Sequence, residues 1–452
     1  MTAAVVLKNE SVNSLEDSYL SKLLSQCEQK NAVIQSEFLT DLKQKAASVL
    51  TQSQFPNKRD EEWQFTDISD LLKIDFQVAQ ETTLTTDILN QFVLEEAKNS
   101  RLVFVNGIYS AELSNTTALL EGVYVGNLSN LSDAKKTKLA SYLGQQEGSN
   151  EFFTALNTAG LDDVAIAWVN SDVMIETPIH LLFLSVVDSV PNIIQTRVLV
   201  VAEPHSQFSI LESYGAVTDN CTDRPQKKPY FSNVVTEIYL AENSEVNHIR
   251  NQRESGDSFH IAKTVISQAK DSRYTNYDFN LGAKLCRHNL EIYQQGEQTE
   301  SNLHGLTIIA GRQVSDTHSA IYLRYPHGKS NQLHKCIVDE YSHAIFSGKV
   351  FVPKAAQMTN ANQLNRNLVL SSKARINTKP ELQITADNVK CSHGATVSQL
   401  EADEVFYLRS RGLNDYDARH LLLDAFAGEI LDKVSLKSLQ QRLRQCISCR
   451  TI

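Results

Sequence analysis

The sequence predicts a mainly β protein in which a strand-rich centre is flanked by helical regions. The centre, residues 166–400, contains short runs rich in β-branched residues, such as TRVLVVAE and NVVTEIYLAE, separated by small and polar residues. Such runs are typical of strands. No helical pattern lies between them, which argues against a parallel sheet built from βαβ units. The regions before and after the centre instead show the periodicity of amphipathic helices.

Residues 1–165 are predicted to form a mainly helical N-terminal region. A helical segment over residues 84–97 and a short extended piece over residues 101–105 belong to it. Its first helices are indicated by apolar residues at helical spacing, namely Leu20, Leu23, Leu24, Cys27, Phe38, Leu39, Leu42, Ala46 and Val49.

Turn-like dipeptides recur along the central region. They begin at Ala202, Ala241, Ala269 and Gly296, at intervals of 39, 28 and 27 residues. Irregular intervals in this range suit a solenoid in which each coil adds short strands to stacked sheets and loops of variable length project outward. From the residues alone, a parallel β-helix and a β-sandwich both remain open.

Residues 401–452 are predicted to form a C-terminal helical region. A helix over residues 402–411 should end at Gly412, because glycine readily adopts the left-handed conformation beyond a helix, and Asn414 can cap the next helix. The next helix carries an apolar stripe, which is typical of a core face. A short terminal unit has a small core of its own, so part of the stripe is available to a partner. The stripe consists of Ala418, Leu421, Leu422, Ala425, Phe426 and Ile430.

Composition narrows the classes of function. Lys and Arg number 43 against 53 Asp and Glu, and the net charge of −10 argues against nucleic acid or an anionic membrane as the main partner. No apolar run approaches a membrane span. The acidic residues Glu10, Glu16, Asp17 and Glu28 fit neither a secretory signal nor a transit peptide. Seven scattered cysteines do not indicate a disulfide framework, so we expect a cytoplasmic protein.

The usual enzyme motifs are missing from the sequence. Gly328-Lys329-Ser330 would suit the end of a phosphate-binding loop, but Leu323 stands where that loop requires glycine. We find no Gly-x-Ser-x-Gly, His-Glu-x-x-His or dinucleotide fingerprint. The sequence therefore predicts a protein that is not an enzyme and binds no nucleotide itself.

Cys391 and His393 are the candidate metal ligands. If residues 390–394 form a strand, both side chains lie on one face about 7 Å apart. A metal or cluster usually takes about four protein ligands, so this pair amounts to half a site. On spacing alone, a buried cysteine and a hydrogen-bonded histidine are the commoner explanation.

Other cysteines and histidines carry weaker signals. Cys446 and Cys449 have Cys-x-x-Cys spacing, but a single pair beside the chain end is expected to be incidental. Five histidines crowd into the β region without a repeated short spacing, and most of them should be surface or hydrogen-bonded residues. These are His304, His318, His327, His334 and His343.

Two motifs together resemble the SufB/SufD family of the Suf iron–sulfur cluster assembly machinery, in its SufD form. The C-terminal motif is Lys379-Pro380-Glu381-Leu382, Ala386-Asp387, Cys391-Ser392-His393-Gly394-Ala395-Thr396 and Phe406-Tyr407-Leu408-Arg409-Ser410-Arg411-Gly412. The N-terminal motif is Pro56, Arg59, Glu61, Glu62, Trp63, Phe65 and Thr66.

This resemblance implies a right-handed parallel β-helix between helical termini. It implies pairing with SufB, binding of the SufC ATPase, and an assembly of one SufB, one SufD and two SufC. His393 would lie at the SufB interface where a nascent iron–sulfur cluster forms and could ligate it, with Cys391 as a weaker second ligand or interface residue. The SufC-docking segment would span residues 406–430. Its candidate residues are Phe406, Tyr407, Arg409, Arg411, Gly412, Ala418, Leu422 and Phe426.

Two alternatives come from other classes. A β-rich homodimeric interaction protein without metal chemistry would pair through an exposed sheet edge. A β-helix enzyme acting on polysaccharide is the second alternative, because the β-helix fold also supports such enzymes.

Overall fold

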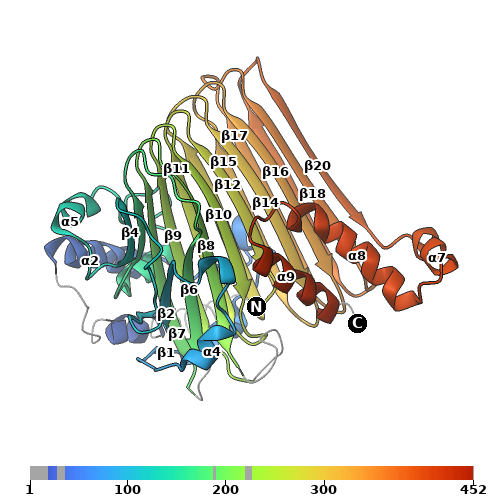
Figure 1. Cartoon of the computed structure of the whole chain (residues 1–452), viewed down its shortest axis with the longest axis horizontal. Coiled ribbons are helices and arrows are strands. Elements are labelled where there is room, and N and C mark those ends of the chain that lie inside the picture. Colours follow the sequence, from blue (N-terminus) through green and yellow to red (C-terminus); the bar gives the residue numbers. More distant parts are fainter. Residues whose placement is uncertain (1–18, 28–35, 187–189, 219–226, 451–452) are drawn as a thin grey trace, which may run out of the picture.

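The computed structural model describes residues 19–27, 36–186, 190–218 and 227–450, and its centre is a parallel β-solenoid (Figure 1). Successive strands alternate between two ten-stranded sheets, here called sheet A and sheet B. Within each sheet, a strand pairs in parallel with the strand of the coil before and the strand of the coil after. The predicted parallel β-helix is confirmed, and a sandwich of antiparallel strands is excluded.

The solenoid strands divide evenly between the sheets. Sheet A contains β5 (Ala165–Val169), β7 (Asn192–Ala202), β9 (Phe231–Leu240), β11 (Phe259–Gln268), β13 (Leu285–Gln294), β15 (Val314–Tyr322), β17 (His343–Val352) and β19 (Arg375–Ile384). Sheet B contains β6 (Ile179–Val186), β8 (Gln207–Val217), β10 (Glu245–Arg253), β12 (Arg273–Asn280), β14 (Glu300–Ile309), β16 (Lys329–Val338), β18 (Asn360–Val369) and β20 (Lys390–Ser398).

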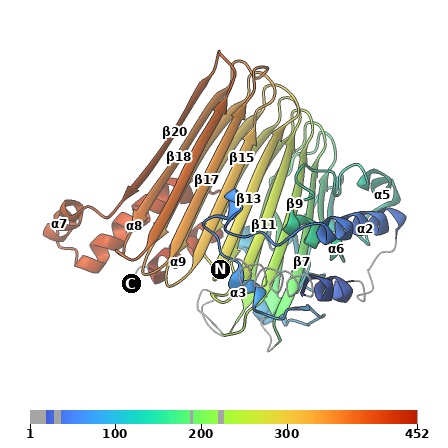
Figure 2. The ribbon, with the colours of Figure 1, turned by 180° about the vertical axis from the view of Figure 1, so that it is seen from behind.

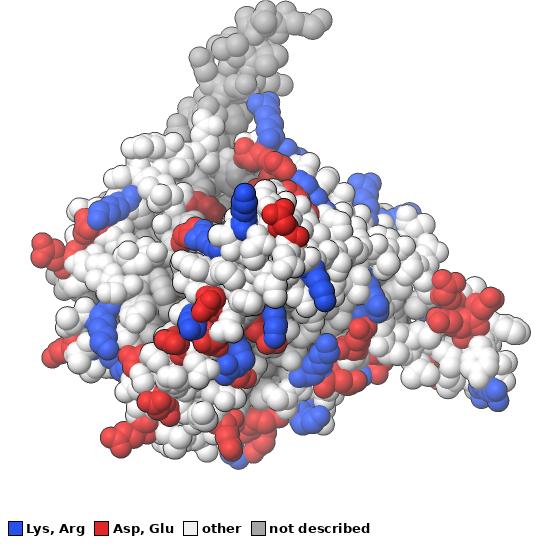
Figure 3. All heavy atoms as spheres, turned by 90° about the horizontal axis from the view of Figure 1, so that it is seen from above, with Lys and Arg blue, Asp and Glu red and all other residues white. Residues whose placement is uncertain are grey.

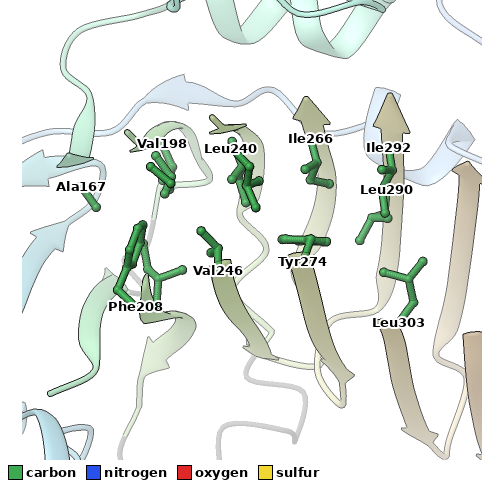
Figure 4. Close-up of a cluster of buried hydrophobic side chains, with 14 of the residues drawn as sticks. Ala167, Val198, Phe208, Leu240, Val246, Ile266, Tyr274, Leu290, Ile292 and Leu303 are labelled. Atoms are coloured by element: carbon green, nitrogen blue, oxygen red, sulfur yellow. The ribbon is translucent and has the colours of Figure 1, made fainter. Parts of the chain in front are cut away.

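Apolar side chains fill much of the space between the sheets. Val198 on β7 and Phe208 on β8 point toward one another across the interior, and Ile266 and Tyr274 do the same farther along (Figure 4). All four are essentially inaccessible to solvent. Since side chains alternate along a strand, every second residue joins this interior and stacks on the equivalent residue of the next coil.

Ionisable side chains also occupy the interior, where several of them pair with one another. Arg250 Nη1 donates to Asp278 Oδ1 at 2.8 Å, and His288 Nδ1 lies 2.9 Å from Asp278 Oδ2. Glu254 Oε2 lies 2.5 Å from His260 Nδ1. Burial alone would raise the pKa of Asp278, but His288 and Arg250 outweigh it and hold that pKa well below its usual range. Pairing of this kind makes buried charges tolerable.

The N-terminal region covers the first coils of the solenoid with helices and adds strands to both sheets. β4 pairs antiparallel with β5, and β2 pairs in parallel with β6 and antiparallel with β3, while β1 pairs with β7. The strands are β1 (Gln77–Val78), β2 (Arg101–Val105), β3 (Ile108–Tyr109) and β4 (Val123–Asn127). The helices are residues 19–27, α2 (Glu37–Thr51), η1 (Glu61–Trp63), α3 (Ser69–Leu72), α4 (Thr86–Asn90), η2 (Glu95–Ala97), α5 (Asp133–Leu139) and α6 (Phe152–Ala159).

In this region one predicted strand is confirmed and one predicted helix is wrong. The extended piece over residues 101–105 is confirmed as β2. The prediction of one helix over residues 84–97 is wrong, because α4 ends at Asn90 and Leu94 is extended before the short η2 helix. The break lets Phe92 and Val93 pack against the outer face of sheet B, which a continuous helix would not allow.

The C-terminal region forms α7 (Ala402–Ser410), α8 (Asp415–Leu431) and α9 (Lys437–Arg450). Gly412 has φ of +99° just beyond α7, and no atom lies within 4 Å of a Cβ built there, so the glycine is required by the backbone angle and not by crowding. Asn414 caps α8 by accepting a hydrogen bond from the Asp417 N–H at 2.8 Å. Both predictions for the helix ends are confirmed.

The predicted apolar stripe on α8 is wrong in part. Ala418 and Ile430 are buried, but Leu421 is 49% exposed and Ala425 is also exposed. Helix α8 packs against both α9 and sheet B, so its buried seam is wider than one stripe and turned away from Leu421. The seam comprises Ala418, Leu423, Ala427, Gly428, Ile430 and Leu431.

The surface shows two further features. Lys and Arg are interspersed with Asp and Glu over the face seen in Figure 3, and are not gathered into one basic patch. Among the described helices, none combines the length and the apolar character that crossing a membrane requires.

Candidate functional site

The solenoid ends at β19 and β20 without a further coil. In the described part of the chain, β19 pairs only with β17 and β20 pairs only with β18, so that each leaves one edge unpaired (Figure 1). We call these two strands, residues 375–398, the open end. No residue of the open end strands is fully buried, whereas β18 in the preceding coil buries every second side chain. An unpaired edge exposes a row of backbone donors and acceptors that another strand can use.

Cys391 and His393 lie at the open end, on the same face of β20. In the parallel pair with β18, Cys391 stands beside Ala361 and His393 beside Gln363. Ala361 and Gln363 are 2% and 1% exposed and belong to the solenoid interior, so the face of β20 that carries Cys391 and His393 continues the interior wall. The predicted strand and the shared face are confirmed.

Cys391 and His393 differ in their exposure to solvent. Cys391 is half-buried and packs against the apolar core, while His393 is exposed. Burial raises the pKa of the Cys391 thiol above its ordinary value. At neutral pH the sulfur is therefore protonated and must lose that proton before it can bind a metal. The imidazole of His393 needs no desolvation to reach a ligand from outside.

A chain of side-chain hydrogen bonds leads through the interior toward His393. Ser319 and Gln332 exchange hydrogen bonds at 2.9 and 3.2 Å, and Gln363 Nε2 donates to Gln332 Oε1 at 2.8 Å. The Gln363 amide oxygen is buried and has no protein hydrogen-bond partner among the described residues. Buried polar atoms without a partner are costly. The chain thus stops one coil short of the open end, directly beside His393.

Cys391 and His393 are the predicted metal ligands at the open end. In the described residues, no group of three or more His, Cys, Asp and Glu side chains is arranged to hold a metal ion. Cys391 and His393 could supply two ligands, whereas a cluster takes about four. Any metal or cluster bound here as cargo would need ligands beyond these two.

Exposed aromatic and apolar side chains lie on α7, which projects beyond the solenoid, and on the first half of α8. Helix α7 buries only Val405, and Figures 1 and 3 both show it projecting past the open end. We call the following residues the α7–α8 patch: Phe406, Tyr407, Tyr416 and Leu421, which are 71%, 56%, 46% and 49% exposed. Clustered exposed aromatic and apolar side chains are typical of protein interaction sites.

The remaining predicted docking residues are spread around this patch. Arg411 stacks over the Tyr407 ring at 5.2 Å, and Arg409 Nη1 lies 3.5 Å from Asp415 Oδ1. Leu422 and Phe426 are half-buried, and Phe426 lies under the Lys335 ammonium, 4.3 Å from the ring centroid. Phe426 and the buried Ala418 therefore contribute mainly to packing, and the free surface belongs to α7 and the start of α8.

A segment between α2 and α3 crosses the outer face of sheet A (Figure 2). We call this segment, residues 54–66, the strap. The Trp63 ring lies over the Arg287 guanidinium, with the Cζ atom 3.9 Å from the ring centroid, and Thr66 Oγ1 donates to Asp316 Oδ2 at 2.5 Å. Arg287 and Asp316 also pair with one another.

Acidic residues of the strap extend these contacts toward the open end. Glu61 Oε1 lies 2.6 Å from the Nζ atom of Lys379 on β19, and Glu62 pairs with His318 and Lys349. This segment carries the N-terminal motif of the family resemblance, but the sequence predicted no role for it. Side chains of the strap form ion pairs and hydrogen bonds with side chains of sheet A. Those partners lie more than 200 positions away in the sequence, and only the fold brings them together.

The other candidates do not form a site with Cys391 and His393. Cys446 is buried in the core between α9 and sheet B, and the side chain of Cys449 lies outside the described residues. His304 and His334 are buried, His318 and His343 are half-buried, and His327 is exposed at a turn. The expectation that most of these histidines are hydrogen-bonded or lie at the surface is confirmed.

Comparison with protein families decides the assignment. Residues 185–426 match the family described as SUF system FeS cluster assembly, SufBD core domain, and residues 13–181 match the SufBD protein N-terminal region. This chain belongs to the SufBD family of the Suf system. The resemblance predicted from the two sequence motifs is therefore confirmed.

Individual relatives agree with the SufBD assignment. An iron–sulfur cluster assembly SufBD family protein of Synechocystis sp. is 60% identical over 454 residues, covering 100% of both chains. A chloroplastic protein of Arabidopsis thaliana, ABCI7, is 32% identical over 412 residues, covering 90% of this chain and 85% of its own. The iron–sulfur cluster assembly protein SufD of Escherichia coli is 34% identical over 214 residues, covering 47% of this chain and 51% of its own.

Proposed function

We propose that this SufBD protein is a SufD-type scaffold subunit without ATPase activity, acting in the cytoplasm. Its open end pairs with SufB, and its C-terminal helices bind SufC. The observation that carries the proposal is the open end itself, where two unpaired sheet edges stand beside Cys391 and His393. A solenoid normally requires a cap at each end, and a partner chain would provide one here.

Pairing with SufB would complete both sheets at once. Strands of SufB can bond to the free edges of β19 and β20 and cover the half-buried side chains between them. The same contact would bring SufB side chains to Cys391 and His393. The nascent iron–sulfur cluster is then cargo shared between the chains, with this chain supplying part of its ligands.

His393 is the principal residue in this proposal. A neutral imidazole can ligate iron or hold a partner thiolate by a hydrogen bond. Cys391 ranks second, because its raised pKa and its packing against the core favour the protonated thiol. The polar chain that ends at Gln363 lies next to His393 and can accept a donor that the partner brings.

The α7–α8 patch is the proposed docking surface for SufC. Its aromatic side chains are exposed, while α8 is fixed to the solenoid by Lys335 Nζ, which lies 2.5 Å from Glu429 Oε2, and by Tyr277, whose hydroxyl donates to the Lys433 carbonyl at 3.2 Å. A movement of SufC on nucleotide binding could thus reach sheet B through α8. The proposed assembly contains one SufB, one SufD-type chain and two SufC, and this chain binds no nucleotide itself.

A homodimer is the second candidate, and the open end also favours it. A second copy offers the same two edges, and a two-fold contact between them is self-complementary. In such a homodimer each copy would contribute its own Cys391 and His393, which gives two cysteines and two histidines. Residues of SufB would be absent from the contact. The polysaccharide-acting enzyme receives no support from the SufBD assignment.

Anaerobic co-expression with SufB and SufC tests the proposal. Native mass spectrometry of the purified chain should find a complex of one SufB, one copy of this chain and two SufC, with iron and sulfide bound. Expression of the chain alone should yield little stable iron and sulfide. Recovery of neither partner, or a homodimer that persists when SufB is in excess, would contradict the proposal.

A further inference from the structure

The strap and the start of α6 enclose a cavity against the outer face of sheet A. Its volume is about 560 Å³, within the range of about 300–1,000 Å³ typical of small-molecule sites. The residues that line it come from the strap, from residues 151–154 and from the sheet A strands β9, β11, β13, β15 and β17. Aromatic walls are supplied by Trp63, Phe152, Phe153, Tyr322 and Phe351. The open end contributes no residue to this lining, so the cavity is separate from the proposed SufB interface.

Arg287 lies in this lining with three of its five N–H donors without a protein partner among the described residues. Its side chain is 1% exposed; Nη1 contacts Asp316, and Trp63 covers a face of the guanidinium. The Nε and Nη2 atoms are buried and have no protein partner among the described residues. These two nitrogens share one edge of the guanidinium, which is the edge that binds a carboxylate through two parallel hydrogen bonds.

Asn289 adds an unused acceptor two residues farther along the same face of β13. Its amide oxygen is buried and also lacks a protein partner, and the residue lines the same cavity. Positions i and i+2 of a strand are about 7 Å apart. One small molecule can therefore contact both Arg287 and Asn289, with an acceptor group at the first and a donor group at the second.

The charges around the cavity disfavour a ligand with more than one negative group, because the lining has more carboxylates than basic side chains. Lys263 Nζ lies 2.5 Å from Glu151 Oε1 and 3.0 Å from Glu291 Oε1, so this buried cation is already matched. Asp60 and Glu61 stand at the strap side of the lining. These carboxylates would repel a dianion such as phosphate. A ligand with a single carboxylate would be repelled less, and it would form two hydrogen bonds with Arg287.

We propose that this cavity binds a small organic carboxylate that also carries a hydrogen-bond donor, as amino acids and hydroxy acids do. The carboxylate accepts from Nε and Nη2 of Arg287, and the donor group binds the Asn289 amide oxygen. The apolar part of the ligand packs among the aromatic walls. Neither SufB nor SufC takes part in this binding, so the site is testable in the isolated chain.

Trp63 provides the readout, because it lines the cavity. The chain has two tryptophans, and the other, Trp168, is fully buried and lies outside the cavity lining. Amino acids and hydroxy acids, the corresponding amides without a carboxylate, and inorganic phosphate are titrated separately while tryptophan fluorescence is recorded. Carboxylates should produce a saturable change in fluorescence, the amides should produce none, and calorimetry should detect the same binding.

Two variants test the assigned contacts. Arg287→Lys keeps the charge but removes the two-nitrogen edge, and should weaken binding about tenfold to a hundredfold. Since Arg287 also holds the strap, Ala320→Leu provides a second test that fills the cavity from β15 and leaves Arg287 unchanged. The matched controls are Arg366→Lys on the outer face of sheet B and Ala425→Leu on the exposed side of α8, both outside the cavity lining.

Each outcome decides for or against the proposal. Loss of carboxylate binding in both variants, with binding kept in both controls, supports the site. Equal binding of carboxylates and amides, binding of phosphate alone, binding that Arg287→Lys and Ala320→Leu leave unchanged, or no binding of any tested compound at millimolar concentration would overturn it.

Discussion

Gln363 and His393 stand side by side in the parallel pair of β18 and β20, yet only Gln363 is buried. Gln363 is 1% exposed, while His393 is exposed to solvent. The difference arises because the coil that would cover β20 does not exist in the described chain. This uncovered surface, which has the character of a solenoid interior, is the one that we propose pairs with SufB.

A charge at the open end should prevent pairing with SufB. Val397 is 54% exposed on β20, so Val397→Asp should change the free energy of unfolding of the isolated chain by less than about 0.5 kcal/mol. Burying the new carboxylate in an interface without a partner should reduce SufB recovery about tenfold or more. The measurement is the amount of SufB that co-purifies.

Leu120→Asp is the matched control for Val397→Asp. Leu120 is 56% exposed and lies in the N-terminal region. This variant should recover SufB as wild type does. Equal loss of SufB in both variants would show a general effect of the charge, and equal recovery in both would place the interface elsewhere.

Truncation of the α7–α8 patch should weaken SufC binding. Phe406→Ala combined with Leu421→Ala removes two exposed apolar side chains without opening a core cavity. Central aromatic residues of interfaces commonly dominate affinity, so we expect a loss of about tenfold or more in calorimetric titration. Met174→Ala, a change at a residue that is 66% exposed elsewhere, should bind SufC normally. SufC binding that survives the double substitution would remove the patch from the interface.

The strap should depend on Trp63. Trp63→Ala removes the contact with Arg287 and the packing of Trp63 on Phe153, whose ring centroids lie 5.5 Å apart. We expect the free energy of unfolding to fall by about 2 kcal/mol, since Trp63 is half-buried and stacked on a desolvated cation. Urea unfolding measures this change. Tyr407→Ala is the control, because Tyr407 also stacks on an arginine but is exposed, and its loss should cost less than about 0.5 kcal/mol.

The contact between Glu62 and His318 should make strap anchoring depend on pH. The hydrogen bond from His318 lowers the pKa of Glu62 to about 2. Burial lowers the pKa of His318, but the Asp316 carboxylate outweighs burial and leaves that pKa above its ordinary value. The His318 contribution is therefore complete below about pH 6.5 and is lost as the pH rises through its folded pKa. The Glu62 contribution is complete above about pH 4.5 and is lost as the pH falls toward 2.

Strap anchoring should accordingly be strongest between about pH 4.5 and 6.5. Because Glu62 is half-exposed, we expect the variation above this window to stay below about 1 kcal/mol. Urea unfolding at a series of pH values measures this variation. In His318→Gln, the loss of stability as the pH rises above this window should be smaller. A stability that rises between pH 6.5 and 8 in wild type relative to His318→Gln would contradict the assigned sign.

The sequence predicted strands and helix ends better than it predicted contacts between distant residues. The strand over Cys391 and His393, the glycine stop after α7 and the Asn414 cap follow from local rules that need no knowledge of distant residues. The spacing of turns suggested coils, although the first interval of 39 residues is long because β8 ends at Val217 and β9 begins only at Phe231. That loop hides the regular period of the later coils.

What the sequence could not predict depends on partners far along the chain. Leu421 has the right spacing for a core stripe, but α9 and sheet B cover a different side of α8. The buried pair of Arg250 and Asp278 occupies alternating positions that resemble an exposed strand face, and only the register of β10 with β12 places the two together. Contacts of the strap are equally remote, since Thr66 meets Asp316 across 250 positions.

The most direct test of the central claim compares cluster loading in wild type and His393→Ala. Both are co-expressed anaerobically with SufB and SufC, and iron and sulfide are measured per purified complex, with the exposed turn residue His205→Asn as the control. We predict that all three proteins recover SufB and SufC and that only His393→Ala loses most of its iron and sulfide. Full loading of the His393→Ala complex would contradict the assignment of His393 to the cluster-assembly site.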